Sequence, residues 1–306
     1  MRNAFADEIT KIGAEDERVV LLSGDIGNNL FEKYKAAARG RFFNCGVAEA
    51  NMMGVAAGLA LNGLRPVVYT ITPFTTTRCF EQIRDDVCYH NVPVIIIGTG
   101  AGLSYAELGP THHSCEDIAI LRSLPGMTVL CPCDAIELRL MLHEALNLGG
   151  PVYMRIGKKG EPVVHKALPD LKIGRSITLR QGKDVCFLST GNVMPMVLAA
   201  ADRLENEGIS VRVESFHTVK PLDTDRLDEV FRTCRIVGAV EEHSKIGGLA
   251  SAVAEWAAAR DGLVGHLAGF SLADEFLHET GSQNYARERL GLTTQVLVDG
   301  IRRRMR

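Results

Sequence analysis

The sequence predicts an α/β fold with two doubly wound α/β domains in series. In both halves of the chain, short apolar runs rich in β-branched residues alternate with longer helical segments, as in buried parallel strands joined by crossover helices. A charged stretch that contains two prolines and three glycines interrupts the alternation at about residues 157–179. We therefore expect a first domain over 1–160, a linker over 161–182 and a second domain over 183–306.

Five runs in the first half have the length and composition of buried strands. They span residues 19–23, 66–70, 93–98, 127–131 and 151–156. Helical segments are expected at 3–13, 49–62, 78–89, 116–124 and 135–148. In the second half, strand-like runs at 184–190, 209–215, 235–241 and 263–268 alternate with helical segments at 194–207, 223–233 and 247–259. This order predicts a parallel sheet in each half.

Composition narrows the class of protein. Hydrophobic residues make up 46% and charged residues 23%, with a formal net charge of −3 and no basic stripe, so neither nucleic acid nor a membrane is expected as a partner. The N-terminus does not resemble a signal peptide, and no apolar stretch approaches the roughly 18 residues that span a bilayer. Eight scattered cysteines indicate a reducing cytoplasm. Cys131-Pro-Cys133 is too tight for a zinc knuckle and has no second pair, so no metal is expected there.

Glu49 is the most informative acidic residue. It lies among valine, alanine and methionine in FNCGVAEANMMGVAAGLALN, residues 43–62. A carboxylate at the start of such an apolar helix is costly to bury unless a partner satisfies it. An acid stabilised by the helix dipole is the structural alternative.

The segment GVAEANMMGVAAGLA, residues 46–60, resembles a motif shared by transketolases, deoxyxylulose-phosphate synthases and the β subunits of 2-oxoacid dehydrogenases. The resemblance covers nearly the whole chain. It implies a thiamine-pyrimidine-binding-like domain followed by a transketolase C-terminal-like domain. It also implies that Glu49 hydrogen-bonds N1′ of thiamine diphosphate, which favours the imino tautomer that removes the thiazolium C2 proton.

Two further segments extend the resemblance. ITPFTTTRCFEQIRDDV, residues 71–87, is similar to the segment whose aromatic residue stacks on the aminopyrimidine, and Phe74 matches that residue. GLSYAELGPTHHSCEDIAILRSLPGM, residues 102–127, is similar to the family's Thr-His motif. The resemblance makes His112 a catalytic and substrate-binding residue and His113 a second candidate for substrate binding. A solvated loop is the alternative for both histidines.

Three more positions are carried over from the family. Arg155 in PVYMRIGKKG matches an arginine that binds the distal phosphate of the substrate, with a structural salt bridge as the alternative. Asp25 and Ile26 follow the first strand, where the resemblance places the cofactor cleft.

The chain also departs from the family pattern. The motif that holds Mg²⁺ and diphosphate, Gly-Asp-Gly with a later asparagine, belongs to another domain. GDIGNN, residues 24–29, contains glycine, aspartate and asparagine, but their spacing differs from that of the motif. We therefore interpret this segment as unrelated to it. Leu108 replaces an aspartate that reads a donor hydroxyl, and Gly100 stands where many members have a histidine. Ordinary pentose phosphates are therefore not the expected donors.

These features predict the small subunit of a split transketolase, which transfers a two-carbon ketol unit from a ketose or its phosphate to an aldose. A diphosphate-binding transketolase N-terminal subunit would be the partner and would supply the Mg²⁺ site, in an α2β2 assembly. The β subunit of a 2-oxoacid dehydrogenase is an alternative, and a non-catalytic interaction module is another of a different class. Intact Glu49, Phe74 and His112 argue against the module, which needs none of them.

Overall fold

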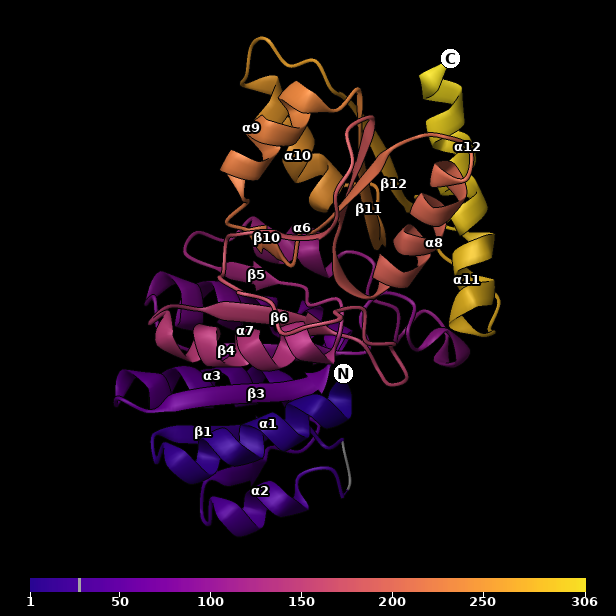
Figure 1. Ribbon diagram of the computed structural model, residues 1–306. Coiled ribbons are helices and arrows are strands. Elements are labelled where there is room, and N and C mark those ends of the chain that lie inside the picture. Colours follow the sequence, from indigo (N-terminus) through magenta and orange to yellow (C-terminus); the bar gives the residue numbers. More distant parts are fainter. Residues whose placement is uncertain (27–28) are drawn as a thin grey trace.

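The computed structural model describes residues 1–26 and 29–306, and it confirms the two α/β domains that the sequence predicts (Figure 1). Each domain has one sheet in which most neighbouring strands are parallel and one edge strand is antiparallel. Part of the segment 24–29, which we read as an unrelated Gly-Asp-rich loop, lies outside the described residues. Among those that are described, no helix is both long and apolar enough to cross a bilayer.

The first sheet has seven strands in the order β10-β5-β6-β4-β3-β1-β2. Its strands are β1 (Val19–Ser23), β2 (Phe42–Asn44), β3 (Arg65–Ile71), β4 (Ile95–Thr99), β5 (Thr128–Leu130), β6 (Val152–Ile156) and β10 (Thr218–Lys220). Strands β1, β4 and β6 are buried along their whole length, as strands covered on both faces must be.

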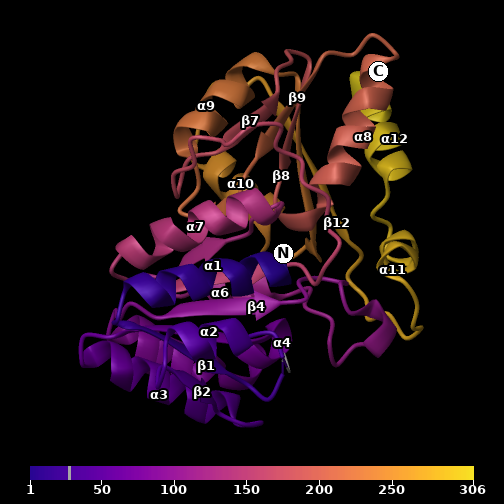
Figure 2. The ribbon, with the colours of Figure 1, turned by 60° about the horizontal axis from the view of Figure 1, so that its bottom comes forward.

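Helices cover both faces of this sheet. On one face α1 (Arg2–Glu15) and α7 (Ala135–Asn147) lie side by side (Figure 2), and α2 (Glu32–Ala37) packs on α1. On the other face α3 (Glu49–Leu61) and α6 (Asp117–Arg122) pack with the segment 77–89. Two apolar clusters therefore form, one on each side of the strands.

The predicted helix over 78–89 is not a single α-helix. The chain forms α4 (Thr72–Thr75), a 3₁₀ turn η1 (Thr77–Cys79), one turn of α5 (Phe80–Gln82) and a π-helix η2 (Ile83–Tyr89). The hydroxyls of Thr76 and Thr77 donate to the carbonyls four residues earlier, each at 2.7 Å. Such side-chain bonds compete with the regular backbone bonds of a helix, which accounts for the interruption at the start.

The second sheet has five strands in the order β12-β11-β8-β9-β7. Its strands are β7 (Ile177–Arg180), β8 (Val185–Ser189), β9 (Val211–Ser215), β11 (Ile236–Ser244) and β12 (His266–Leu272). Strand β7 lies inside the segment 161–182, so the second sheet begins earlier than residue 183.

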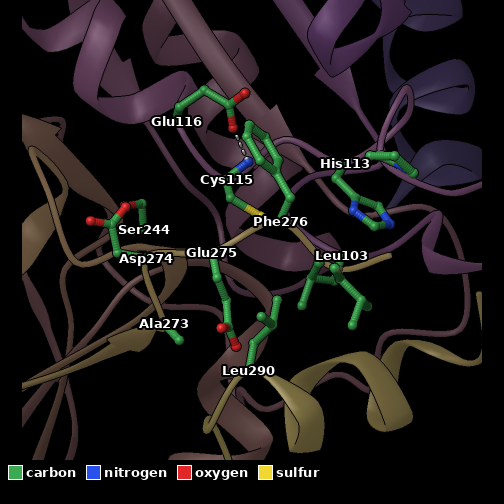
Figure 3. A pocket seen from close by; sticks show the side chains of 12 residues that line it. Leu103, His113, Cys115, Glu116, Ser244, Ala273, Asp274, Glu275, Phe276 and Leu290 are labelled. Atoms are coloured by element: carbon green, nitrogen blue, oxygen red, sulfur yellow. Dashed lines mark hydrogen bonds between the residues drawn. The ribbon is translucent and has the colours of Figure 1, made fainter. Parts of the chain in front are cut away.

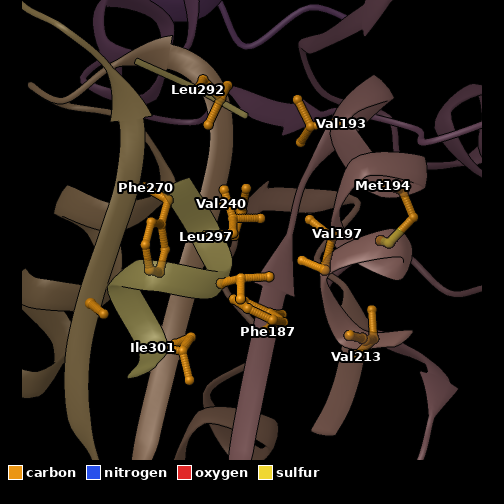
Figure 4. Packing of buried hydrophobic residues seen from close by; sticks show 14 of the residues in the cluster. Phe187, Val193, Met194, Val197, Val213, Val240, Phe270, Leu292, Leu297 and Ile301 are labelled. Atoms are coloured by element: carbon orange, nitrogen blue, oxygen red, sulfur yellow. The ribbon is translucent and has the colours of Figure 1, made fainter. Parts of the chain in front are cut away.

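Helices again cover both faces of the second sheet. They are α8 (Met194–Glu205), α9 (Thr224–Thr233), α10 (Leu249–Ala258), α11 (Gln283–Arg289) and α12 (Thr294–Met305), together with the 3₁₀ turns η3 (Ala106–Leu108) of the first domain and η4 (Gly191–Val193). On one face, Phe187 and Phe270 of the sheet pack against Val197 of α8 and against Leu297 and Ile301 of α12 (Figure 4). Helices α9 and α10 cover the opposite face.

The two domains meet at the β5 edge of the first sheet, where β10 pairs antiparallel with β5 (Figure 1). Arg155 of β6 is buried at this junction, with 2% of its surface exposed. Its Nε donates to Asp117 at 2.7 Å, and its Nη2 donates to the carbonyls of Ser114 at 2.9 Å and Glu242 at 2.8 Å. One guanidinium thus ties both domains together. Burial acts to raise the pKa of Asp117. The charges of Arg155 and His243, together with hydrogen bonds from Tyr153 and Arg155, outweigh burial and hold that pKa below its ordinary value.

We expect Arg155→Met to lower the free energy of unfolding by about 3–5 kcal/mol, because it leaves the Asp117 carboxylate buried without its charged partner. Urea unfolding followed by circular dichroism measures the change. The double variant Arg155→Met, Asp117→Leu should regain most of the loss, since both charges are then removed. Equal stability of the single variant and the unaltered chain would contradict this role.

Candidate functional site

The predicted residues Glu49, Phe74 and His112 follow three parallel strands of the first sheet, β2, β3 and β4. Glu49 begins α3 after β2, Phe74 lies in α4 after β3, and His112 lies in the loop after β4. Because parallel strands end at one edge of a sheet, the segments that follow them meet there. The structure brings the three side chains into one group through Arg78.

Glu49 is a buried carboxylate at the first turn of α3, with 7% of its surface exposed. Within residues 1–26 and 29–306, the one hydrogen bond to its carboxylate comes from Nη1 of Arg78 at 3.3 Å. The positive end of the α3 dipole also favours a negative charge here. The carboxylate is thus sheltered from water and keeps capacity for another donor.

Arg78 also covers the ring of Phe74. Its guanidinium carbon lies 3.7 Å from the ring centroid, a cation–π contact. The Phe74 and His112 rings meet edge to face with centroids 5.3 Å apart. Sequence reasoning missed Arg78 as a member of the site, although the residue opens the RCFEQIR part of the quoted motif.

The surroundings of His112 favour the neutral form of its imidazole. Burial lowers the pKa of its imidazole, and the nearby positive charge of Arg78 lowers it further. Its Nδ1 lies 2.9 Å from the hydroxyl of Thr111, and its ring lies 6.2 Å from that of Tyr105. A neutral imidazole can donate a hydrogen bond from one nitrogen and accept one at the other.

His113 faces a different space. It lines a cavity of about 320 Å³ between the two domains, together with Cys115 and Glu116 of its own loop and Phe276 and Leu290 of the second domain (Figure 3). Its Nε2 is buried without a hydrogen-bond partner in the described chain. The two adjacent histidines therefore belong to separate environments.

Asp25 and Ile26 lie on the loop after β1. The Asp25 carboxylate accepts a bond from Nδ2 of Asn44 at 3.0 Å, and Oδ1 of Asn44 accepts from the backbone of Gly46 at 2.9 Å. These bonds tie the loop to the segment that leads into Glu49. Ile26 lines a separate cavity of about 400 Å³ beside Phe31 and Phe42.

Arg155 does not belong to the group formed by Glu49, Phe74 and His112. It lies in the domain junction, where its Nε and Nη2 already donate to protein oxygens. Of the two roles that the sequence left open, this position favours the structural salt bridge over a contact with a substrate phosphate.

Gly100 and Leu108 lie in the loop between β4 and His112. Gly100 has φ of +81°, and an added Cβ would approach Cε2 of Tyr105 to 2.0 Å, so a histidine at position 100 would displace Tyr105. Leu108 ends the short turn η3 with an exposed side chain.

Comparison with known proteins gives matches over almost the whole chain. Residues 1–161 match the family model of the transketolase pyrimidine-binding domain, and residues 174–295 match that of the transketolase C-terminal domain. A 6-deoxy-6-sulfo-D-fructose transketolase subunit of Clostridium sp. strain MSTE9 is 35% identical, with 97% of this chain and 92% of the relative covered. An apulose-4-phosphate transketolase subunit of Actinobacillus succinogenes is 34% identical, with 85% and 83% covered.

Solved structures of transketolases also match this chain. A split-gene transketolase, described as an inactive β4 tetramer, superposes with a TM-score of 0.89 at 35% identity, covering 99% of this chain and 97% of that one. A transketolase mutant from Pichia stipitis shares the fold with a TM-score of 0.78 at 20% identity. That match includes 98% of this chain but only 45% of the Pichia chain.

Replacing Arg78 with glutamine removes a positive charge from the surroundings of His112, so the pKa of His112 should rise toward its ordinary value. An NMR pH titration of the His112 ring protons measures the change. Arg84→Gln, at an exposed arginine in the following π-helix, is the matched control and should leave the pKa unchanged. An unaltered pKa in Arg78→Gln would mean that burial alone depresses it.

Proposed function

Because the chain belongs to the transketolase family, we propose that it is the small subunit of a split thiamine-diphosphate-dependent transketolase. In this proposal it transfers a two-carbon ketol unit from a ketose to an aldose when a second polypeptide is bound. The grouping of Glu49, Arg78, Phe74 and His112 at one edge of the sheet carries the proposal. A structural module would have no need for a sheltered carboxylate beside a half-buried aromatic ring.

Transketolase-family enzymes use thiamine diphosphate, and the residues of this chain fit its pyrimidine ring. The planar guanidinium of Arg78 stacks on Phe74 and hydrogen-bonds Glu49, so these two side chains are spaced to hold a flat nitrogen-bearing group. When bound, the cofactor supplies a carbon nucleophile and an electron sink for carbon–carbon bond cleavage.

Each residue then has a defined task. Glu49 would share one proton with a ring nitrogen of the pyrimidine, sheltered from water: it donates the hydrogen bond while it holds the proton and accepts the bond once the nitrogen holds it. Phe74 would stack on the ring, which requires the Arg78 side chain to leave. His112, whose pKa is lowered by burial, would hydrogen-bond an oxygen of the substrate.

The partner subunit would hold the diphosphate and Mg²⁺, since the family motif for both is missing from this sequence. Large apolar side chains remain exposed along and beside α3, including Val47 with 76% and Val55 with 41% exposure. Covering such a surface favours association. A related split-gene transketolase is described as an inactive β4 tetramer, and we propose that this chain is likewise incomplete alone and active in an α2β2 assembly in the cytoplasm.

The donor is proposed to be a ketose other than the ordinary pentose phosphates. Leu108 stands where an aspartate of the family reads a donor hydroxyl, and Gly100 where many members have a histidine. An apolar side chain at such a position cannot bond a hydroxyl, so it penalises substrates that would leave that group unpaired. Two relatives act on 6-deoxy-6-sulfo-D-fructose and apulose-4-phosphate according to their names.

Glu49→Gln should lower kcat by at least about 100-fold in the assembled enzyme, because a neutral amide cannot share a proton with the cofactor. Steady-state assay with ketose donors measures the loss, and circular dichroism checks that the cofactor still binds. Glu32→Gln is the matched control, since Glu32 also begins a helix but lies exposed on α2. Full activity of Glu49→Gln would refute the proposed role of Glu49.

Activity of the assembled enzyme with pyruvate instead of ketoses would favour a 2-oxoacid dehydrogenase subunit.

Cofactor binding should depend on the second subunit. Titration calorimetry with thiamine diphosphate and Mg²⁺ should give saturable binding to the complex of this chain with one that carries the Gly-Asp-Gly motif. Each chain alone should bind far more weakly, because neither offers both ends of the cleft. Equal affinity of this chain alone and of the complex would contradict the split site.

A further inference from the structure

A cluster of buried metal-ligating groups lies outside the proposed catalytic site. Sγ of Cys133, a carboxylate oxygen of Glu137 and a ring nitrogen of His165 all lie within 4.8 Å of one another. Nε2 of His165 is 2.9 Å from Oε1 of Glu137 and 4.0 Å from Sγ of Cys133. Cys133 and Glu137 are fully buried. The sequence alone suggested no metal here, because the three ligands come from two distant segments.

The surrounding chain positions these ligands. The carboxylate of Asp134 caps α7 and also accepts bonds from the backbone of Val164 at 2.9 Å and of His165 at 3.3 Å. Oε2 of Glu137 accepts from the backbone of Cys133 at 2.7 Å, which leaves Oε1 directed at the histidine. Such outer bonds fix ligands in metal sites.

A polar atom beside the cluster lacks a partner. Nε2 of His217 is buried without a hydrogen bond in the described chain, and the residue is fully buried. His217 is near enough to Glu137 and His165 for their charges to act on its pKa. Buried polar atoms without partners point to an additional bound species.

We propose that Cys133, Glu137 and His165 bind a zinc ion that joins the start of α7 to the 161–182 segment at the domain junction. Sulfur, nitrogen and oxygen ligands in one buried site suit Zn²⁺. Tetrahedral zinc separates its ligand atoms by roughly 3.3–3.7 Å, so the observed 2.9 and 4.0 Å require a small rotation of His165. A water molecule or His217 would be the fourth ligand of the zinc ion.

The charges of this site balance. Zn²⁺ with one thiolate and one carboxylate is neutral. Without a cation the carboxylate of Glu137 faces His165. The Cys133 thiol has a raised pKa because of burial and of the neighbouring carboxylates. On binding, its proton and any proton on His165 leave to solvent, and sulfur and nitrogen each donate an electron pair to the metal.

Cobalt(II) is the probe for this site. The reduced, chelator-treated chain should bind one equivalent of Co²⁺ and develop a sulfur-to-cobalt charge-transfer band in the near ultraviolet, and Zn²⁺ should displace it. Cys133→Ala should abolish the band and weaken binding at least about tenfold, since losing even an outer partner of a ligand has that effect. Cys131→Ala is the matched control, because Cys131 is equally buried two residues away but outside the cluster.

His165→Gln provides a second test if Cys133→Ala fails to fold, and it should likewise weaken Co²⁺ binding at least about tenfold. Atomic emission on the purified chain should give one zinc per chain. No near-ultraviolet band, or equal binding by Cys133→Ala and Cys131→Ala, would overturn the proposal and leave ordered water as the occupant.

Discussion

The ion pair between Glu49 and Arg78 is the interaction on which the site depends. A carboxylate at the start of an apolar helix needs a donor, and in the chain by itself that donor is Arg78 at 3.3 Å. The same guanidinium covers Phe74. Its charge also lowers the pKa of His112, in addition to the larger lowering caused by burial. One side chain therefore satisfies Glu49 and shields the ring that the cofactor would need. If Phe74 and Glu49 hold the cofactor as proposed, Arg78 covers that surface in the chain by itself and would have to move when the cofactor binds.

The junction between the domains contains buried polar and charged side chains that bond to one another. Arg155, Asp117 and Tyr153 form a buried group in which the tyrosine hydroxyl also donates to the carboxylate. Glu242 of β11 lies nearby and accepts bonds from the backbone of Leu103 and from Gln283. Buried charges are tolerated only when they are paired, so these contacts fix one relative placement of the two sheets. The loop that carries His112 and His113 lies just before this junction in the chain, so the junction also positions the site.

Most of the fold could be predicted from the sequence because five-residue buried strands carry a strong apolar pattern. Strands β2 and β10 have three residues each and form through pairing that no local pattern reveals. Helix α12 was not among the expected helices, although it carries a readable signal, an N-cap at Thr293 and apolar residues at 297, 298 and 301. In the candidate site, motif resemblance predicted Glu49, Phe74 and His112, whose side chains the structure groups around Arg78. Arg155 was ambiguous because Asp117, its partner, lies 38 residues away in the sequence.

Strand β10 has a consequence for how the chain is made. The first sheet is completed at its β5 edge by residues 218–220, which follow β7, β8 and β9 in the sequence. During synthesis the first half leaves the ribosome with that edge open, and it stays open until about sixty more residues emerge, at roughly 5–20 residues per second. Unpaired strand edges attract other strands. We therefore expect chaperones to bind the unpaired β5 edge of the nascent first domain for a few seconds in each round of translation.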